Sequence, residues 1–522
     1  MRRALALLFL VFAPACGGPV GKEQDRVLHR RLEGEPQTLN ALTATSDPEN
    51  VVIALLQRNL LDYDENLNLV PGLAESVEAD QNRLVYTVTL RGDARWEDGT
   101  AVTSDDVKAT LDALVDPKTP ALYRKSLFDG LERVEVVDAR TARVTFRTAS
   151  PGQRSAFNLP LLPARLYRGT DVATNPANRR PLATGPFRLA SWEGGTIRLV
   201  RNTQYFGPPP AWEQVVLRVV PESSPAFQAL LTGALDETRL NAVQRAEAAG
   251  DGEIREVRYE EIAYTYLAWN NRLPQFQDPR VRRALTMLID RETIARTLYG
   301  GLARPANGPL PPGLWPYDPT LAPLPYDPVR AASLLDEAGW RKGRDGVRSR
   351  GADKLAFTLS SGGGSERQRQ INETAQRAFR EAGIEMALVP LEWGAFVEKV
   401  DAGSYEACAL ALNLDPNPDL RPNWHSSQVP PNGMNHSFYR NARADALMDE
   451  LAVTFDREKA KTLYAKLQRI IAEDQPFSFL HTVSVAWGVR SRVENVKTSP
   501  VGLWLFWPGA AGWQPARAAR PI

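Results

Sequence analysis

Cysteine and histidine are scarce in this chain of 522 residues, which contains 2 cysteines and 4 histidines. Cys408 lies within an apolar run, so we expect a buried thiol and no disulfide. Only His425 and His436 are close to one another in sequence, and their spacing does not match that of a metal site. The motifs HExxH and GxSxG and a spaced cysteine cluster are also missing. We therefore predict no metal, no cofactor and no catalytic residue.

Strong net charge and long apolar runs are missing as well. The net charge is +1 and no basic stripe runs along the chain, so nucleic acid is not expected as a partner. Outside residues 4–13, no stretch approaches the roughly 20 apolar residues of a membrane-spanning helix. With 43% apolar and 24% charged residues, the composition is that of a globular protein, and the length calls for more than one core.

The first residues have the features of an export signal. Arg2 and Arg3 precede an apolar run, and small residues then lead up to Cys16. This order resembles a bacterial lipobox, although Ala13 stands where leucine is usual. We expect residues 1–15 to be a signal peptide, Cys16 to be lipidated and residues 16–26 to be a tether in the periplasm or cell envelope. An ordinary secretory signal with an incidental cysteine is the alternative.

The middle of the chain contains a buried strand followed by two helices. Residues 262–269 are almost all apolar or aromatic, as in a strand that is covered on both faces. Asp278 and Pro279 then form a helix start, and an apolar stripe follows at helical spacing. A second helix begins at Asp290 and ends at Gly300. Because a domain's length of chain lies on either side, we interpret this stretch as a crossing between two lobes.

The two halves of the chain have different patterns. In the first half, alternation predicts strands at 84–90, 133–137 and 142–146, among scattered helices. After the crossing, residues 304–328 carry nine prolines, which predicts an extended surface loop; a flexible linker between domains is the alternative. Beyond this loop, strands alternate with helices, which predicts βαβ units and a mainly parallel sheet. A strand at 477–487 is expected to return the chain to the first lobe.

Several segments, in the same order along the chain, resemble the extracellular solute-binding proteins of family 5, the peptide and nickel class that supplies ABC importers. They are residues 69–76 (LVPGLAES), 91–100 (RGDARWEDGT), 184–187 (TGPF), 278–290 (DPRVRRALTMLID) and 335–340 (LDEAGW). The resemblance implies an α/β, two-lobed periplasmic-binding-protein-like fold (type II, the large cluster with an extra subdomain) around a hinged cleft. The implied ranges are 27–268 for lobe I, about 45–180 for its inserted subdomain, 269–478 for lobe II and 479–522 for the return to lobe I.

The resemblance also implies a ligand site. The strand expected at 405–412 is followed by Asn413 and Asp415, and ligands of α/β sheets bind beyond the carboxyl ends of strands. In peptide-binding members, an aspartate at the place of Asp415 holds the α-amino group of the ligand; a simple turn at Asp415 and Pro416 is the alternative. Other residues implied to line the cleft, each with an ordinary loop or core role as its alternative, are Asn413, Trp393, Thr45, Ser46, Asp47 and Tyr123.

One departure concerns the carboxyl end of the ligand. Peptide-binding relatives often place basic residues after the tryptophan, whereas this chain has Val400, Asp401, Ala402 and Ala409 there. A conventional clamp for a free carboxylate is therefore not expected.

We expect a monomeric binding protein, not an enzyme, that binds a short peptide or amine-bearing solute and docks on an ABC permease. The alternatives are a binding protein for a sugar, opine or metal chelate, a ligand-presenting sensor and, remotely, a secreted hydrolase.

Overall fold

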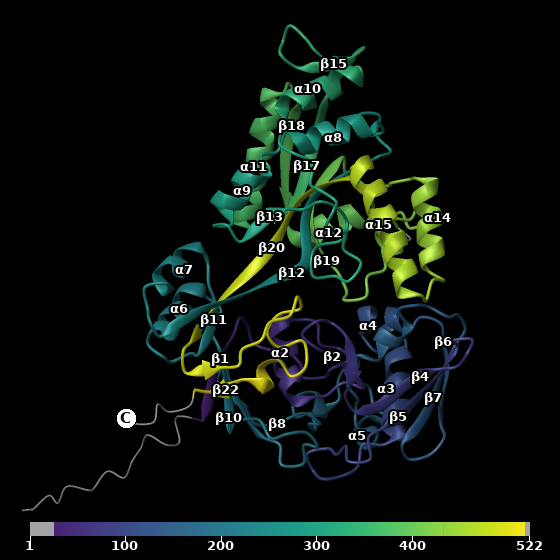
Figure 1. The fold of residues 1–522 in the computed structure, drawn as a ribbon, viewed down its shortest axis with the longest axis vertical. Helices are drawn as coiled ribbons and strands as arrows, with labels where there is room; N and C mark the ends of the chain where they lie inside the picture. Colours follow the sequence, from purple (N-terminus) through teal and green to yellow (C-terminus); the bar gives the residue numbers. More distant parts are fainter. Residues whose placement is uncertain (1–25, 432, 517–522) are drawn as a thin grey trace, which may run out of the picture.

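The computed structural model describes residues 26–431 and 433–516, apart from the side chains of Leu122 and Tyr123. Two lobes lie one above the other in Figure 1, and two long antiparallel strands, β12 (Ile254–Trp269) and β20 (Phe477–Arg490), run between them. The expected signal peptide (1–15) and Cys16 lie outside the described residues. No helix in the described part of the chain is long and apolar enough to cross a membrane.

Lobe I is built on a four-stranded sheet with the order β1-β10-β9-β8. Its first two strands are parallel and the others are antiparallel. Helix α2 (Asp47–Leu56) packs on this sheet and begins where Glu49 accepts the backbone N–H of Ser46. The other elements of this part are β1 (Val27–Leu32), β8 (Phe187–Glu193), β9 (Thr196–Arg201), β10 (Gln214–Val219), α6 (Ser223–Leu231), β11 (Glu237–Arg239), α7 (Ala242–Ala248), β21 (Val493–Glu494), η3 (Gly509–Gly512) and β22 (Gln514–Pro515).

A subdomain with its own core is inserted into lobe I. Its antiparallel sheet has the order β4-β5-β7-β6, and Trp96, Phe146 and Phe157 are among its buried side chains. The strands expected at 84–90, 133–137 and 142–146 are confirmed within one or two residues at their ends. The elements are β2 (Leu61–Tyr63), β3 (Leu69–Pro71), β4 (Ala74–Ala79), β5 (Val85–Leu90), α3 (Ser104–Val115), α4 (Leu122–Leu127), β6 (Leu131–Val136), β7 (Thr141–Phe146), η1 (Gln153–Phe157), α5 (Ala164–Tyr167) and η2 (Pro176–Asn178).

Lobe II contains most of a seven-stranded sheet with the order β11-β20-β12-β19-β17-β18, in which β13 (Ala303–Pro305) also pairs with β20. Strand β17 (Ala356–Gly362) is parallel to both β18 (Glu385–Leu391) and β19 (Ala407–Asn413). All other pairs are antiparallel, because β12 enters the sheet against the direction of β19 and β20 runs back along β12. The expectation of a mainly parallel sheet is therefore wrong beyond β17, β18 and β19.

Helices cover both faces of this sheet. One core contains α8 (Pro279–Met287), α9 (Arg291–Leu298), α10 (Pro328–Glu337) and α11 (Glu366–Glu381). The other contains α12 (Trp393–Asp401), α13 (Arg421–Trp424), α14 (Ala442–Leu451) and α15 (Arg457–Asp474). The start expected for α8 is confirmed, since Asp278 accepts the N–H of Arg280 with Pro279 in the first turn. Three short strands, β14 (Arg341–Lys342), β15 (Arg348–Arg350) and β16 (Asp353–Lys354), form the tip of the lobe (Figure 1).

The proline-rich segment contains no helix from residue 304 to residue 327, as its composition predicts, and α10 begins at its last proline, Pro328. It does not lie on the surface throughout, because Leu310 is fully buried and Leu314 is 4% exposed. Both side chains pack into the core beneath α14 and α15. The segment is therefore a packed part of lobe II, and the interpretation as a surface loop is wrong for its middle.

The crossing strands change their pairing between the lobes. The register of β12 against β20 shifts between Glu260 and Tyr264. Before the shift, Arg255 pairs with Val489, whose other neighbour is β11 of lobe I. After the shift, β12 lies between β20 and β19. The strand pair thus links the lobes, while the residue ranges given above for the lobes and the subdomain stay predictions.

Candidate ligand-binding cleft

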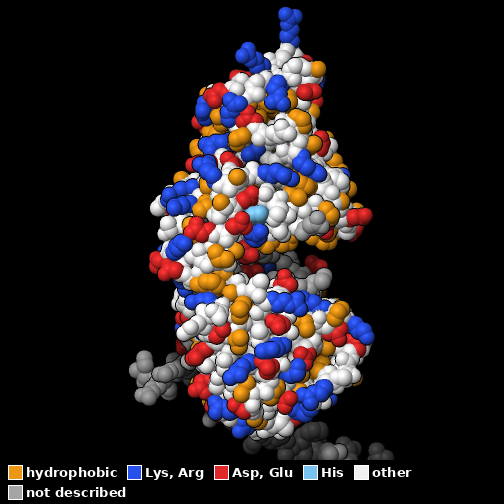
Figure 2. Space-filling view, turned by 90° about the vertical axis from the view of Figure 1, so that its right-hand side faces the viewer, with side chains coloured by type: hydrophobic (Ala, Val, Ile, Leu, Met, Phe, Trp, Pro, Cys, Tyr) orange, Lys and Arg blue, Asp and Glu red, His pale blue; other side chains and the backbone are white. Residues whose placement is uncertain are grey.

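A cleft separates the lobes on one side of the crossing strands, and Figure 2 shows it as a notch at mid-height. The carboxyl ends of β17, β18 and β19 lie at one edge of the sheet, because these strands are parallel. Asn413, the last residue of β19, pairs with Ala263 next to the register shift of β12. This edge therefore faces lobe I, and the residues that follow the three strands approach the cleft from lobe II.

Asp415 lies in the loop that follows β19 and is exposed. Its negative charge acts across the cleft on Tyr63, on β2. Burial, with the negative charge of Asp415 acting in the same direction, raises the pKa of the Tyr63 hydroxyl to about 12. Two residues further along, the side chain of Asn417 lies against Gly152, where an added Cβ would be 3.1 Å from the Asn417 Nδ2. The loop after β19 thus contacts the inserted subdomain of lobe I.

Trp393 is the first residue of α12 and is 60% exposed. Its ring lies over Gly362 at the end of β17, since a Cβ on that glycine would be 2.7 Å from the Trp393 Cε3. The centre of the Phe396 ring is 5.8 Å away and supports the indole from the helix side. Glu392 caps the helix by accepting the N–H groups of Gly394 and Ala395. A large aromatic surface is thereby held at the same sheet edge as Asn413.

The segment Thr45–Asp47 lies at the start of α2, beside the crossing strands. The buried carboxylate of Glu49 accepts the N–H groups of Thr45 and Ser46 at 2.8 and 2.9 Å, which orders the segment. Burial alone would raise the pKa of Glu49, but these backbone N–H groups hold it below its usual value. Asp47 is exposed and close to Glu261 of β12.

Glu261 forms an ion pair with Arg239 of β11, with 3.1 Å between Oε1 and Nη2. Burial raises the pKa of Glu261, and the charge of Asp47 adds to this, although Arg239 opposes both. The pair therefore places opposite charges at the point where β12 leaves lobe I.

The comparison with known proteins agrees with this architecture. The model of the bacterial extracellular solute-binding proteins, family 5 (middle region), matches residues 68–435. The chain belongs to this family.

Relatives of known function match nearly the whole solute-binding protein. It is 29% identical to the oligopeptide-binding protein AppA of Bacillus subtilis, with 96% of each chain covered. It is 25% identical to the glutathione-binding protein GsiB of Pectobacterium atrosepticum, with 95% of this chain and 96% of the relative covered. The solved structure of B. subtilis AppA in complex with a nonapeptide has a TM-score of 0.75 at 27% identity and covers 94% of this chain and 99% of its own. The two-lobed fold expected from the resemblance is confirmed, and the relatives are binding proteins rather than enzymes.

The structure brings most of the predicted site residues of this solute-binding protein to the cleft. Asn413, Asp415 and Trp393 share one edge of the lobe II sheet, and Thr45, Ser46 and Asp47 lie beside the crossing strands in lobe I. Tyr123 lies on α4, and its side chain is outside the described part of the structure. The roles of all seven residues in binding a ligand stay predictions.

Sequence patterns did not single out Tyr63, Arg239 or Glu261. Arg239 and Glu261 lie on β11 and β12, which both pair with the distant strand β20, whereas Tyr63 lies on β2, which pairs with the neighbouring β3. The local signal for Glu261 is the carboxylate pair Glu260 and Glu261, which directly precedes the apolar part of β12.

His425 and His436 contact different residues. His425 Nδ1 contacts the Ser427 hydroxyl at 2.7 Å, whereas His436 lies 3.8 Å from Asp401. Among the described residues, no group of three or more His, Cys, Asp and Glu side chains is arranged to hold a metal ion. Cys408 is fully buried, as expected, and burial raises the pKa of its thiol.

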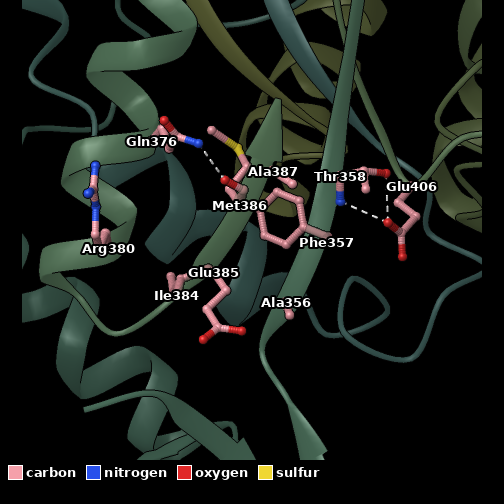
Figure 3. A pocket seen from close by; sticks show the side chains of 10 residues that line it. All are labelled: Ala356, Phe357, Thr358, Gln376, Arg380, Ile384, Glu385, Met386, Ala387 and Glu406. Carbon is pink, nitrogen blue, oxygen red and sulfur yellow. Dashed lines mark hydrogen bonds between the residues drawn. The ribbon is translucent and has the colours of Figure 1, made fainter. Parts of the chain in front are cut away.

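A second hollow of about 690 Å³ lies at the opposite end of the parallel strands (Figure 3). It is formed by α11 and the first residues of β17 and β18. Some of its polar groups have partners within the protein: Glu406 accepts both the N–H and the hydroxyl of Thr358 at 2.7 Å, and Gln376 donates to the Met386 carbonyl. Because the hollow lies at the end of the strands that points away from the cleft, we assign no ligand to it.

Proposed function

We propose that this solute-binding protein captures a short peptide, or another amine-bearing solute, between its lobes and delivers it to an ABC permease. The position of Asp415 carries the proposal: it follows a strand whose carboxyl end faces lobe I, and its charge acts on Tyr63 of that lobe. A carboxylate in such a cleft binds an ammonium group through short, charge-assisted hydrogen bonds. The peptide-binding and glutathione-binding relatives support the same class of ligand.

The proposed mechanism is closure around the ligand. A solute that contacts both lobes stabilises their closed arrangement and shifts the population towards it. Asp415 would hold the amine from lobe II, the exposed indole of Trp393 would cover an apolar part of the ligand, and the Thr45–Asp47 segment would contact it from lobe I. The register shift of β12 beside Glu260 is the place where the strand pair would bend.

Two candidate classes of ligand differ in whether they need a binding site for a carboxyl end. Residues 400–402 and 409 provide no basic side chain. This favours ligands whose affinity comes from the amine, and it keeps a non-peptide solute such as an opine, sugar or metal chelate as the second candidate. A sensor that presents its ligand to a receptor would use the same cleft.

The decisive experiment is native mass spectrometry of the protein expressed without residues 1–15 and purified gently. A spread of co-purified masses that matches short peptides is the expected result, whereas one discrete non-peptide mass would favour the second candidate. Titration with trialanine, N-acetyl-trialanine and trialanine amide then tests the ends of the ligand. Acetylation should abolish binding and amidation should change it little. Recovery of intact trialanine after long incubation separates a binding protein from a hydrolase.

We also propose that the protein is located at the cell envelope. Export through residues 1–15 and lipidation of Cys16 would tether the monomeric protein to the cell envelope by residues 16–26. This keeps the cleft close to a permease, and the lipid would be its only attachment to the membrane.

A further inference from the structure

The inserted subdomain contacts lobe II at a second place, through an arginine and an aromatic ring. The guanidinium carbon of Arg83 lies 4.4 Å from the centre of the Phe455 ring, a cation–π geometry. Arg83 belongs to the turn between β4 and β5, and Phe455 to the loop between α14 and α15. In Figure 1 the lower ends of α14 and α15 lie directly above this subdomain.

Both partners are held in position by their own segments. The backbone of Arg83 is left-handed (φ 57°), which a non-glycine residue rarely adopts. Asp80 stabilises this turn because its Oδ1 accepts the N–H groups of Leu84 and Val85 at 2.8 and 3.0 Å. Phe455 directly precedes Asp456, which caps α15 by accepting the N–H of Lys459 at 2.7 Å. The two side chains are therefore presented to one another by ordered turns.

We propose that Arg83 and Phe455 form an interlobe latch that keeps part of the ligand-free protein closed. Together with the contact between Gly152 and Asn417, it joins the subdomain to lobe II, and both contacts separate when the lobes open. An exposed cation–π pair changes a two-state equilibrium by about 2- to 5-fold. Because the latch acts on closure and touches no ligand, its loss lowers the affinity for every ligand by the same factor.

The test needs no ligand, so its outcome is independent of the proposal about peptides. Spin labels are attached to Val137→Cys in the subdomain and Val329→Cys in lobe II, which replace side chains that are 48% and 80% exposed. The native Cys408 is buried and escapes labelling, and Cys16 is replaced by serine so that only the two introduced cysteines react. Pulsed electron paramagnetic resonance then measures the distances between the lobes in the ligand-free protein.

Arg83→Ala and Phe455→Leu should each shift the ratio of closed to open protein about 2- to 5-fold towards open, and the double variant should shift it no further. Arg91→Ala is the matched control, because Arg91 lies 4.6 Å from the Phe206 ring within the same lobe. It should leave the distances unchanged. A ligand-free protein that is wholly open, single variants with the original distances, or a double variant whose shift is the sum of the two would each overturn the latch.

Discussion

Asp415 on lobe II lies near enough to Tyr63 on lobe I for its negative charge to act on the Tyr63 hydroxyl. Burial is the main reason that the pKa of Tyr63 rises to about 12, and the charge of Asp415 contributes in the same direction. A turn at Asp415 and Pro416 alone would not require this approach to the other lobe. The relationship therefore supports Asp415 as the anchor of a ligand enclosed between the lobes.

Replacing this carboxylate by an amide should weaken an amine-bearing ligand. Asp415→Asn removes a charge-assisted hydrogen bond, which is worth about 1.5–3 kcal/mol, so the affinity for trialanine should fall at least about 10-fold. Isothermal titration calorimetry measures the change. Asp419→Asn, in the same loop and exposed, is the control and should bind as the original protein does. If Asp415→Asn binds trialanine with the same affinity as the original protein, Asp415 does not anchor the ligand.

The position of Trp393 depends on the absence of a side chain at residue 362. Gly362→Ala would place a Cβ 2.7 Å from the indole and force the ring away from the sheet edge. If the indole covers the ligand, affinity should fall by about 0.5–1.5 kcal/mol, the worth of an aromatic contact, without loss of the fold. Gly252→Ala is the control, because nothing lies within 4 Å of the added Cβ. Unchanged binding by a folded Gly362→Ala protein would argue that Trp393 lies outside the ligand site.

Stability should depend on pH through His481 on β20. Its ring is fully buried, Nε2 contacts the Arg291 carbonyl at 2.7 Å, and burial lowers its pKa from 6.5 to about 4. The unfolded chain therefore binds a proton that the folded protein excludes. The contribution of His481 is full above pH 6.5 and declines by about 3 kcal/mol in total as the pH falls towards 4.

Urea unfolding of the original protein and of His481→Gln between pH 7.5 and pH 4 measures this contribution. The variant should lose less stability over that range. Parallel pH dependences of the two proteins would show that His481 does not titrate differently in the folded and unfolded states.

Lobe I contains a buried ion pair, Arg30–Glu237, with 3.0 Å between Nε and Oε1. The guanidinium carbon of Arg30 also lies 5.0 Å from the ring centres of both Trp504 and Trp513. Arg30→Met leaves the Glu237 carboxylate buried without this partner and should lower the free energy of unfolding by about 3–5 kcal/mol. Arg30→Met combined with Glu237→Gln should be less destabilised in urea unfolding, because no carboxylate remains to be buried. A double variant that is less stable than the single one would contradict this reasoning.

The proposed lipid anchor rests on Cys16. Cys16→Ala should abolish incorporation of labelled palmitate and release the protein from the membrane fraction. Ala13→Leu is the matched control, since it restores the residue usual at that place and should keep the protein anchored. Retention of Cys16→Ala on membranes after a high-pH wash would point to another means of attachment.

Local patterns in the sequence were sufficient for many individual elements. Asp278 and Pro279 mark the start of α8, and Asp290 marks that of α9, because a helix cap involves only neighbouring residues. Alternating side chains located the strands of the inserted subdomain for the same reason. The ordered family segments, taken together, also indicated the two-lobed fold and placed Asp415 and Trp393 in the expected cleft.

The tertiary structure alone decided how these elements meet. The antiparallel entry of β12 against β19, the register shift at Glu260 and the burial of the proline-rich segment depend on contacts between distant parts of the chain. Tyr63 opposite Asp415 and Arg83 beside Phe455 arise in the same way. Such contacts follow from strand order and register, which are set by the packing of whole layers, and no local pattern of side chains specifies them.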